Sequence, residues 1–295
     1  MGVLSAARRG RWRIHRRREL PASAIAPLTA EALPLAPIFK EEKGHRVGVA
    51  ALAAEAAEHE VVVKERVVSL WRGLLHLLLR SPLERAWEAA RALEVRRLPA
   101  PRALALLVEH RLAVPVRARL VSERVAGAVP LGADLLDRFY PHRRGDGARG
   151  ALKARIVALA QLVRELHESG LYHRDLNPSN LLVAPDGAGG ERLLLVDLDS
   201  LDPGRRLTLR RRRKNLVQLG LIPEGHISAR DRLRFLHAYD GGDGHTWNRD
   251  SIAALDAALA DEIVRIIARM SLHERRHGAE GGDPRFVAEE LGRER

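Results

Sequence analysis

The sequence predicts an α+β fold of two lobes, in which a small β-rich lobe precedes a mainly helical one. The length of 295 residues suits one large domain or two lobes with a cleft between them. Four strand-like apolar runs occur within residues 37–125, and apolar residues at helical spacing recur within residues 126–277. Two short apolar runs, Leu181–Val183 and Leu193–Val196, flank a polar, glycine-rich tip and predict a hairpin of buried strands in the second lobe.

The composition is strongly basic and contains no cysteine. The 50 Lys and Arg residues exceed the 38 Asp and Glu residues, and the net charge of +12 favours anionic partners such as phosphorylated glycans or acidic lipid head groups. No aromatic stacking platform or helix-turn-helix signature is visible, so we expect no nucleic-acid partner. The lack of cysteine excludes disulfides and is compatible with a reducing cytoplasm. Because no run of about 18 apolar residues and no secretory signal is found, we expect a soluble or peripheral cytoplasmic protein.

The two ends of the chain are predicted to be mobile. Residues 1–36 form a basic segment that either is attracted to an anionic surface or is a loosely docked tail. Trp12 and Ile14 alternate with charged residues, so a short strand over residues 11–17 is also conceivable. The second mobile end is the tail, residues 278–295.

The small lobe is expected to hold two pairs of strands. Lys64 follows three valines in HEVVVKER and therefore projects from a buried strand. An inter-lobe hinge is expected near Glu123, where the last strand ends. The four predicted strands are residues 46–52, 59–66, 103–109 and 117–124.

Two helices are predicted between these strand pairs. Ser69–Arg80 is a basic amphipathic helix that either lies on a membrane or packs on its own lobe, and we favour packing. Pro82–Arg96 carries an apolar stripe and two glutamates, Glu84 and Glu88, one turn apart.

The second lobe begins with a linker-like stretch over residues 127–150, followed by an amphipathic helix at Leu152–Ser169. After the hairpin comes an arginine cluster that is predicted either to clamp acceptor anions or to form a solvated loop. The cluster comprises Arg205, Arg206, Arg210–Arg213 and Lys214, and the predicted closing helices are residues 215–221, 230–239 and 252–270.

Polar residues flank the predicted hairpin in a pattern that suits phosphoryl transfer. His173, Asp175 and Asn180 match H-x-D-x-x-x-x-N before the first run, and Asp197 follows the second run, 17 residues after Asn180. The hairpin would bring Asp175, Asn180 and Asp197 to one end. Such a site needs one carboxylate to accept a hydroxyl proton, and an amide and a second carboxylate to hold magnesium. Ordinary turn chemistry does not require this order of residues.

Over residues 45–240 the chain resembles the lipopolysaccharide kinases, which phosphorylate Kdo or heptose sugars of the lipopolysaccharide inner core and belong to the protein-kinase-like fold. The segments that carry the resemblance are VVVKERV, ERAW followed by LPAPRALAL, HRDLNPSN, VDLD, and RRRKNL leading to RDRLRFLHAY.

The resemblance implies a bilobal protein-kinase-like fold and a role for each motif residue. Lys64 would hold the phosphates of ATP, and Asp175 would be the general base that positions a sugar hydroxyl. Asn180 and Asp197 would bind Mg²⁺, and His173 would brace the loop. The implied partners are an anionic glycolipid or sugar acceptor and peripheral contact with the inner face of the cytoplasmic membrane.

The chain also departs from the family and from protein kinases. Ala86 stands where the heptose kinases carry a glutamate, so Glu84 or Glu88 must pair with Lys64 or the pair is absent. Gly44 and Gly48 lie near the place of a glycine-rich loop, but no G-x-G-x-x-G is present. Asn177 replaces the lysine of Ser/Thr protein kinases, and DLD lacks their glycine.

Three alternatives stay open at this point. A small-molecule phosphotransferase of the aminoglycoside or choline type would use the same Asp, Asn and Asp, but for a cationic substrate it would carry a more acidic pocket. A protein kinase is disfavoured by Asn177. A non-catalytic pseudokinase scaffold is favoured by the weak glycine loop and opposed by the intact Lys64, Asp175, Asn180 and Asp197.

Overall fold

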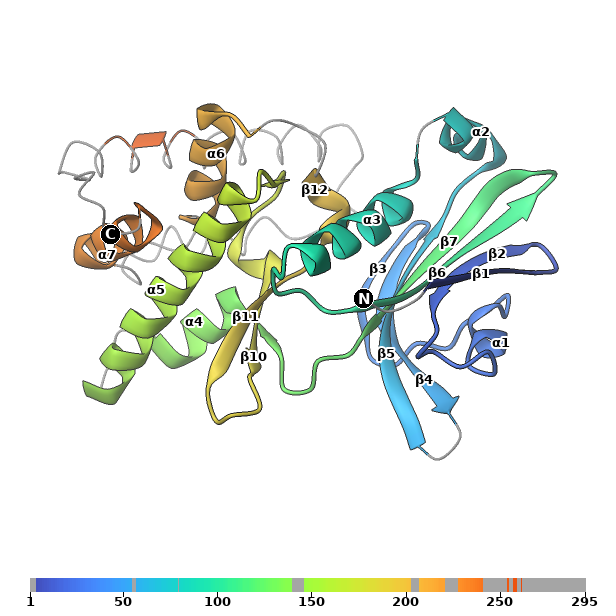
Figure 1. The fold of residues 1–295 in the computed structure, drawn as a ribbon, viewed down its shortest axis with the longest axis horizontal. Coiled ribbons are helices and arrows are strands. Elements are labelled where there is room, and N and C mark those ends of the chain that lie inside the picture. The colour runs from blue at the N-terminus through green and yellow to red at the C-terminus, as the bar shows by residue number, and fades with distance from the viewer. Residues whose placement is uncertain are drawn as a thin grey trace.

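The chain folds into two lobes, an antiparallel sheet and a mainly helical lobe, which lie next to each other along the long axis of the molecule (Figure 1). This confirms the predicted α+β fold with the β-rich lobe first. The structure is a computed structural model that describes residues 4–54, 57–78, 80–139, 146–202, 207–220, 228–240, 254, 257, 258 and 261.

Seven strands form the sheet of the small lobe, in the order β1-β2-β6-β7-β5-β4-β3. Each strand is antiparallel to its neighbours. The four predicted strands are confirmed as β4 to β7, with ends that differ by a few residues. The strands are β1 (Leu4–Arg9), β2 (Trp12–Arg17), β3 (Ile38–Glu42), β4 (His45–Ala54), β5 (Ala57–Val67), β6 (Ala103–Arg111) and β7 (Val114–Glu123).

Residues 4–17 belong to this sheet, which corrects the expectation of a mobile segment over residues 1–36. Strand β2 pairs with β6 along its length, and β1 pairs with β2. The side chains of Trp12 and Ile14 point to the core face and are 7% and 2% exposed, because alternate residues of a strand share a face. Pairing with a distant strand therefore orders this arginine-rich segment, and the local pattern does not reveal that partner.

Three helices accompany the sheet: α1 (Ile25–Leu28), α2 (Leu70–Leu78) and α3 (Pro82–Val95). Helix α3 begins with a capping box in which Ser81 and Glu84 satisfy each other's backbone N–H groups. Its buried stripe, including Trp87, packs against β6 and β7. Figure 1 shows α3 between the sheet and the large lobe.

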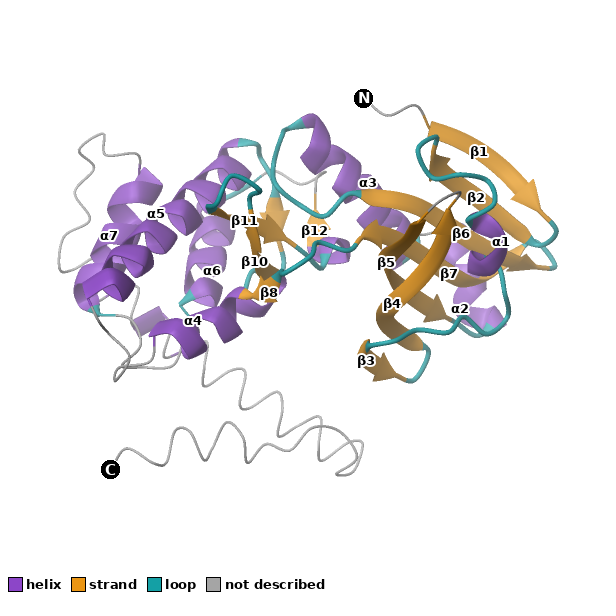
Figure 2. Cartoon of the chain, turned by 90° about the horizontal axis from the view of Figure 1, so that it is seen from below, coloured by secondary structure: helices purple, strands orange, loops and turns teal. Residues whose placement is uncertain are grey.

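The large lobe contains four helices among the described residues: α4 (Leu131–Phe139), α5 (Asp146–Glu168), α6 (Leu209–Leu219) and α7 (Ala229–Asp240). Its short elements are β8 (Val129–Pro130), β9 (Tyr172–His173), η2 (Pro178–Asn180), β10 (Leu181–Pro185), β11 (Glu191–Leu195), η3 (Leu198–Ser200) and β12 (Leu201–Asp202). The buried side of α5, including Ile156 and Leu166, packs against Leu181 and Leu195 of the hairpin. Strands β10, β11 and β12 lie between the sheet and these helices (Figure 2).

The large lobe corrects two expectations from the sequence. The predicted linker over residues 127–150 contains α4 and the start of α5, because Leu131 and Leu135 are buried in the core of this lobe. Residues 210–213 begin α6 and do not form a loop, since Thr208 caps the helix by accepting the N–H of Arg211. The predicted helix 252–270 extends beyond the described residues, and the predicted tail 278–295 lies outside them.

Among the described helices, none is both long enough and apolar enough to cross a bilayer.

Candidate active site

The β10–β11 hairpin brings the two predicted magnesium ligands together. Leu181 pairs with Leu195, and the backbone N–H of Val196 donates to the carbonyl oxygen of Asn180 at 3.0 Å. Asn180 therefore lies beside Val196, the residue before Asp197, at the end of the hairpin opposite its Asp186–Gly190 turn. The strands hold this register because Leu181, Val183 and Leu195 are buried.

Asp175 is exposed and is held by two amide side chains. The Nδ2 of Asn177 donates to Oδ1 of Asp175 at 3.0 Å, and the Nδ2 of Asn180 donates to Oδ2 at 3.1 Å. Asn177 also caps η2, where its Oδ1 accepts the N–H groups of Ser179 and Asn180. These contacts fix the carboxylate while leaving it accessible to an acceptor. The residue that replaces the protein-kinase lysine thus orients Asp175.

His173 joins the loop to the end of β11. Its Nδ1 accepts the backbone N–H of Asp175 at 3.3 Å, and its Nε2 lies 3.2 Å from the carbonyl oxygen of Val196. This arrangement requires the neutral ring with the proton on Nε2. The side chain is fully buried, and burial lowers the pKa of His173.

Lys64 reaches the same place from β5 of the small lobe. Its Nζ lies 2.6 Å from Oδ1 of Asp197 and 2.6 Å from Oδ1 of Asp199. Burial alone would lower the pKa of Lys64, but the two carboxylates outweigh burial and raise it. The predicted cofactor-binding lysine and the predicted metal-binding aspartate are therefore in direct contact.

Neither Glu84 nor Glu88 contacts Lys64, so of the alternatives left open by the sequence the structure agrees with the absence of a lysine–glutamate pair. Glu84 caps α3 and pairs with Arg13 at 3.1 Å, and Glu88 pairs with Arg80. Asp199 is the additional partner that the sequence analysis missed. The sequence feature that could have indicated this partner is the second aspartate of VDLD, which lies two residues beyond Asp197.

Asp197 adopts the left-handed backbone conformation, with φ 56° and ψ 47°, which is uncommon for a residue other than glycine. The chain turns there from β11 into η3, which places both carboxylates near Lys64. Burial opposes ionisation of Asp197, but the hydrogen bond from Asp199 and the charge of Lys64 prevail and lower the pKa of Asp197 to about 2. Burial raises the pKa of Asp199. The two carboxylates thus ionise unequally around one lysine.

A buried polar network from α6 supports the loop from behind. The Nδ2 of Asn215 donates to the carbonyl oxygen of His173 at 2.5 Å and to Oε1 of Gln218 at 3.0 Å. Gln218 donates through Nε2 to the carbonyl oxygen of Arg174 at 2.9 Å. Asn215 is fully buried and Gln218 is nearly so. The predicted arginine-rich segment therefore continues into a helix that fixes the backbone on the N-terminal side of Asp175.

The arginines themselves lie at the start of α6. Arg211 stacks over the ring of Tyr172, with its guanidinium carbon 5.2 Å from the ring centre. Arg210 and Arg213 are exposed. Arg205 and Arg206 lie outside the described residues. The predicted clamp on acceptor anions thus stays a prediction.

The place of a glycine-rich loop is taken by the short turn between β3 and β4. Gly44 has φ 73°, and an added Cβ would lie 2.6 Å from the carbonyl oxygen of Val67, so only glycine fits there. Gly48 lies within β4, close to Pro37. His45 follows the turn, and its pKa is lowered by burial and then by the charge of Lys64.

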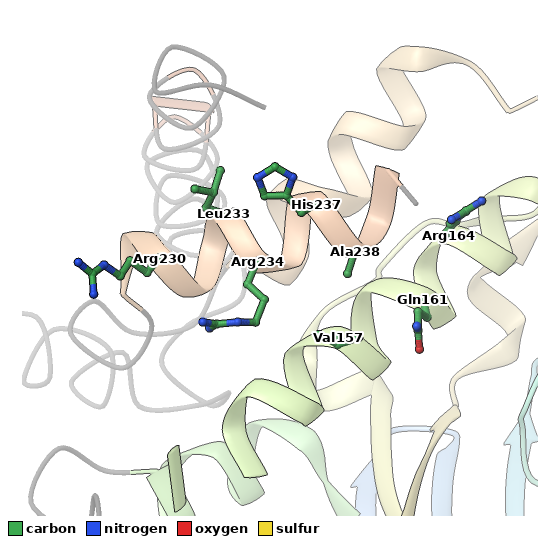
Figure 3. A pocket seen from close by; sticks show the side chains of 8 residues that line it. All are labelled: Val157, Gln161, Arg164, Arg230, Leu233, Arg234, His237 and Ala238. Carbon is green, nitrogen blue, oxygen red and sulfur yellow. The ribbon is translucent and has the colours of Figure 1, made fainter. Parts of the chain in front are cut away.

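A separate groove lies between α5 and α7 on the large lobe (Figure 3). None of the predicted site residues lines it, so it is not the candidate active site. Its lining residues are Val157, Gln161, Arg164, Arg230, Leu233, Arg234, His237 and Ala238.

Comparison with known protein families identifies the family of this chain. The profile of the lipopolysaccharide kinase (Kdo/WaaP) family matches residues 35–239, about two thirds of the chain. The chain belongs to this family. The match includes Lys64, the HRDLNPSN loop, both aspartates of VDLD and the α6 network, and it begins after β1 and β2.

Two individual relatives are similar to parts of the chain. The chain is 30% identical over 186 residues to 3-deoxy-D-manno-octulosonic acid kinase of Stenotrophomonas maltophilia, a match that spans 61% of this chain and 65% of that relative. A stretch of 48 residues, 16% of this chain and 8% of the relative, is 40% identical to the serine/threonine-protein kinase PknI of Mycobacterium bovis.

A solved structure confirms the protein-kinase-like fold of this family. WaaP in complex with acyl carrier protein aligns with a TM-score of 0.56 and 23% identity, over 77% of this chain and 87% of that chain.

Proposed function

We propose that this protein is an ATP- and Mg²⁺-dependent kinase that transfers the γ-phosphate to a sugar hydroxyl of the lipopolysaccharide inner core, on Kdo or heptose. The observation that supports it most is the meeting of Lys64, Asp175, Asn180 and Asp197 at one end of the β10–β11 hairpin. Family membership supports the same chemistry.

In the proposed reaction Asp175 is the general base. Its carboxylate is exposed and held by Asn177 and Asn180, so it can orient an acceptor hydroxyl toward the phosphate and accept its proton. Lys64 would offset the charge of the transferring phosphate, together with the Mg²⁺ that Asn180 and Asp197 would hold. Catalysis would therefore come mainly from positioning the reactants and from electrostatic stabilisation.

The oxygen donors present suit Mg²⁺. Asp197 supplies a carboxylate and Asn180 an amide oxygen, both hard ligands. Among the described residues, no group of three or more acidic, histidine or cysteine side chains forms a metal site. That fits Mg²⁺, which binds through one or two carboxylates together with waters and substrate phosphates. When bound, the ion would offset the negative charge of the nucleotide phosphates.

Lys64 would contact the α- and β-phosphates of ATP. Its ammonium group is paired with Asp197 and Asp199, whose negative charges raise the pKa of Lys64. Asp199 would hold the lysine in place, a role that a helix glutamate performs in other kinase-like folds.

The acceptor is proposed to be an anionic sugar at the cytoplasmic face of the inner membrane. The name of the Stenotrophomonas relative supports Kdo, a sugar acid, as the acceptor. The net charge of +12 supports an anionic substrate and opposes a cationic aminoglycoside.

The test is Mg²⁺-dependent transfer of label from γ-labelled ATP to a panel of acceptors. Kdo–lipid A, a heptosylated core glycolipid, an aminoglycoside and a protein mixture would be compared. Label on a core sugar is expected. Label on the aminoglycoside or on protein alone would overturn the acceptor and keep the chemistry, whereas no transfer together with no nucleotide binding would favour the scaffold alternative.

A further inference from the structure

Helix α2 exposes four large apolar side chains. Leu70, Trp71, Leu74 and Leu75 are 49%, 80%, 42% and 58% exposed, and they form two adjoining rows at four-residue spacing. Gly73 faces the sheet closely, since an added Cβ there would lie 2.3 Å from the carbonyl oxygen of Pro115. The helix thus packs on its own lobe, as favoured from the sequence, but these four apolar side chains stay exposed.

Basic residues surround this helix. A groove between α2 and two hairpin turns, β1–β2 and β6–β7, is lined by the arginines Arg8, Arg11, Arg13, Arg80 and Arg111. Glu84 is the acidic residue in that lining. Leu112 lies at the tip of the β6–β7 turn and is 93% exposed.

The arginine side chains remain open to solvent although several have acidic neighbours. Arg11, Arg13 and Arg80 are 64%, 53% and 69% exposed. His110 lines the same groove, and its pKa is lowered first by burial and then by the positive charge of Arg13. The result is a positively charged groove with an apolar helix on one side and an apolar tip on another.

We propose that this surface, the α2 face, docks on an anionic phospholipid bilayer. We define it by the four exposed residues of α2, by Leu112 and by the five lining arginines. Trp and Leu on one side of a helix with arginines beside them is the composition of helices that lie in the membrane interface. Each basic residue near an anionic leaflet adds attraction that is screened by salt.

The position of the α2 face favours a bilayer over a protein partner. The helix and the hairpin turns project at the end of the sheet that is remote from the helices of the large lobe (Figure 1). A flat fluid surface can receive a projecting tryptophan and a projecting leucine together with the arginines between them. The proposal deepens the proposed function, on which it rests for a membrane glycolipid as the acceptor.

The experiment is binding of the full chain to vesicles of phosphatidylcholine with and without phosphatidylglycerol, measured by cosedimentation and by tryptophan fluorescence. Binding that requires phosphatidylglycerol and weakens as ionic strength rises above about 0.1 M is expected. Arg8→Gln with Arg80→Gln should weaken binding about 25-fold, at about fivefold per arginine. Trp71→Ser with Leu75→Ser should weaken it about tenfold or more and abolish the blue shift of emission.

Matched controls use exposed residues outside the α2 face. Val95, which is 61% exposed, is changed to Ser, and exposed Arg91 and Arg96 of the α3 region are changed to Gln. These variants should bind vesicles like the wild type. All variants should melt like the wild type and phosphorylate a deacylated, water-soluble acceptor equally well, so failure of the kinase reaction is separable from failure of docking.

Three results would overturn the proposal. The first is no vesicle binding by the wild type, and the second is binding that the control substitutions weaken as much as those of the α2 face. The third is tight binding of a purified acidic protein, lost in the α2-face variants, in the absence of vesicle binding.

Discussion

At the scale of single residues, the main finding is that Lys64 has two carboxylate partners from the large lobe and none from α3. Asp197 and Asp199 each lie 2.6 Å from its Nζ. The sequence motif predicted Lys64 and Asp197, because their patterns are local. It did not predict Asp199 or the contact of Asn177 with Asp175, since both depend on how distant segments meet.

We predict that Asp199→Asn lowers kcat about 100-fold, because a misplaced Lys64 no longer offsets charge on the phosphates. Glu84→Gln and Glu88→Gln are the matched controls and should stay within about threefold of the wild type, since neither side chain contacts the lysine. Steady-state kinetics with varied ATP would check this. An equal loss in either glutamine variant would show that α3 supplies the partner in the working enzyme.

At the scale of elements, α6 fixes the start of the loop that carries Asp175. Asn215 and Gln218 bind the carbonyl oxygens of His173 and Arg174, and His167 of α5 lies 3.1 Å from Oδ1 of Asn215. The sequence indicated a helix here from residue 215, but its apolar spacing could not reveal that the buried side also carries amides. Buried polar side chains on a helix are usually hydrogen-bonded, and here their partners are backbone carbonyl oxygens of a different segment.

Asn215→Leu should destabilise the protein by about 1–3 kcal/mol, because the carbonyl oxygen of His173 and the Oε1 of Gln218 each lose a buried donor. It should also lower kcat with little change in the KM for ATP, since Asp175 loses its orientation. Lys214→Leu, at the exposed neighbouring position, is the control. Urea unfolding and kinetics measure the two effects, and a lower stability with unchanged kcat would contradict the positioning role.

His167 links stability to pH. Its pKa is lowered by burial from 6.5 to about 4, so the unfolded chain binds a proton that the native chain does not bind between these pH values. Stability from this group is therefore complete above pH 6.5 and is lost as pH falls toward 4, by about 3 kcal/mol in all. His167→Gln should show a smaller loss of unfolding free energy over this range, measured by denaturant titration. Parallel pH profiles of the two proteins would contradict this assignment.

At the scale of the whole molecule, the N-terminal segment is built into the small lobe. Arg119 of β7 is fully buried and pairs with Glu65 through Nε at 2.7 Å. Its Nη1 donates to the carbonyl oxygens of Leu28 and Ala30 at 2.7 Å, and its guanidinium lies over the ring of Trp12. One arginine thus joins β2, the α1 region and the centre of the sheet.

Arg119→Met should cost about 3–5 kcal/mol of stability, because it leaves the Glu65 carboxylate buried beside weaker partners. Adding Glu65→Gln should restore part of the loss by removing that charge. Thermal or urea unfolding of both single variants and the double variant gives the coupling. Additive losses would mean that the two side chains do not act as a pair.

The four central strands and the β10–β11 hairpin could be predicted, because apolar periodicity and motif spacing are local signals, and the resemblance to lipopolysaccharide kinases implied the two-lobe fold. The ordered N-terminal strands could not, since β1 and β2 are stabilised by pairing with β6, about 90 residues away in sequence. Helix α4 could not be predicted either, because the stretch before it is rich in glycine and proline. The helix buries Leu131 and Leu135 in the core of the large lobe. The roles of Lys64, Asp175, Asn180 and Asp197 stay predictions until activity is measured.

The most direct test of the central claim is single-turnover transfer from γ-labelled ATP to Kdo–lipid A by the wild type and by Asp175→Asn. Asp186→Asn, at the opposite end of the same hairpin, is the matched control. We predict that Asp175→Asn binds nucleotide normally but transfers phosphate about 1,000-fold more slowly, while Asp186→Asn transfers at the wild-type rate. If Asp175→Asn transferred phosphate to the sugar at the wild-type rate, Asp175 would not be the general base.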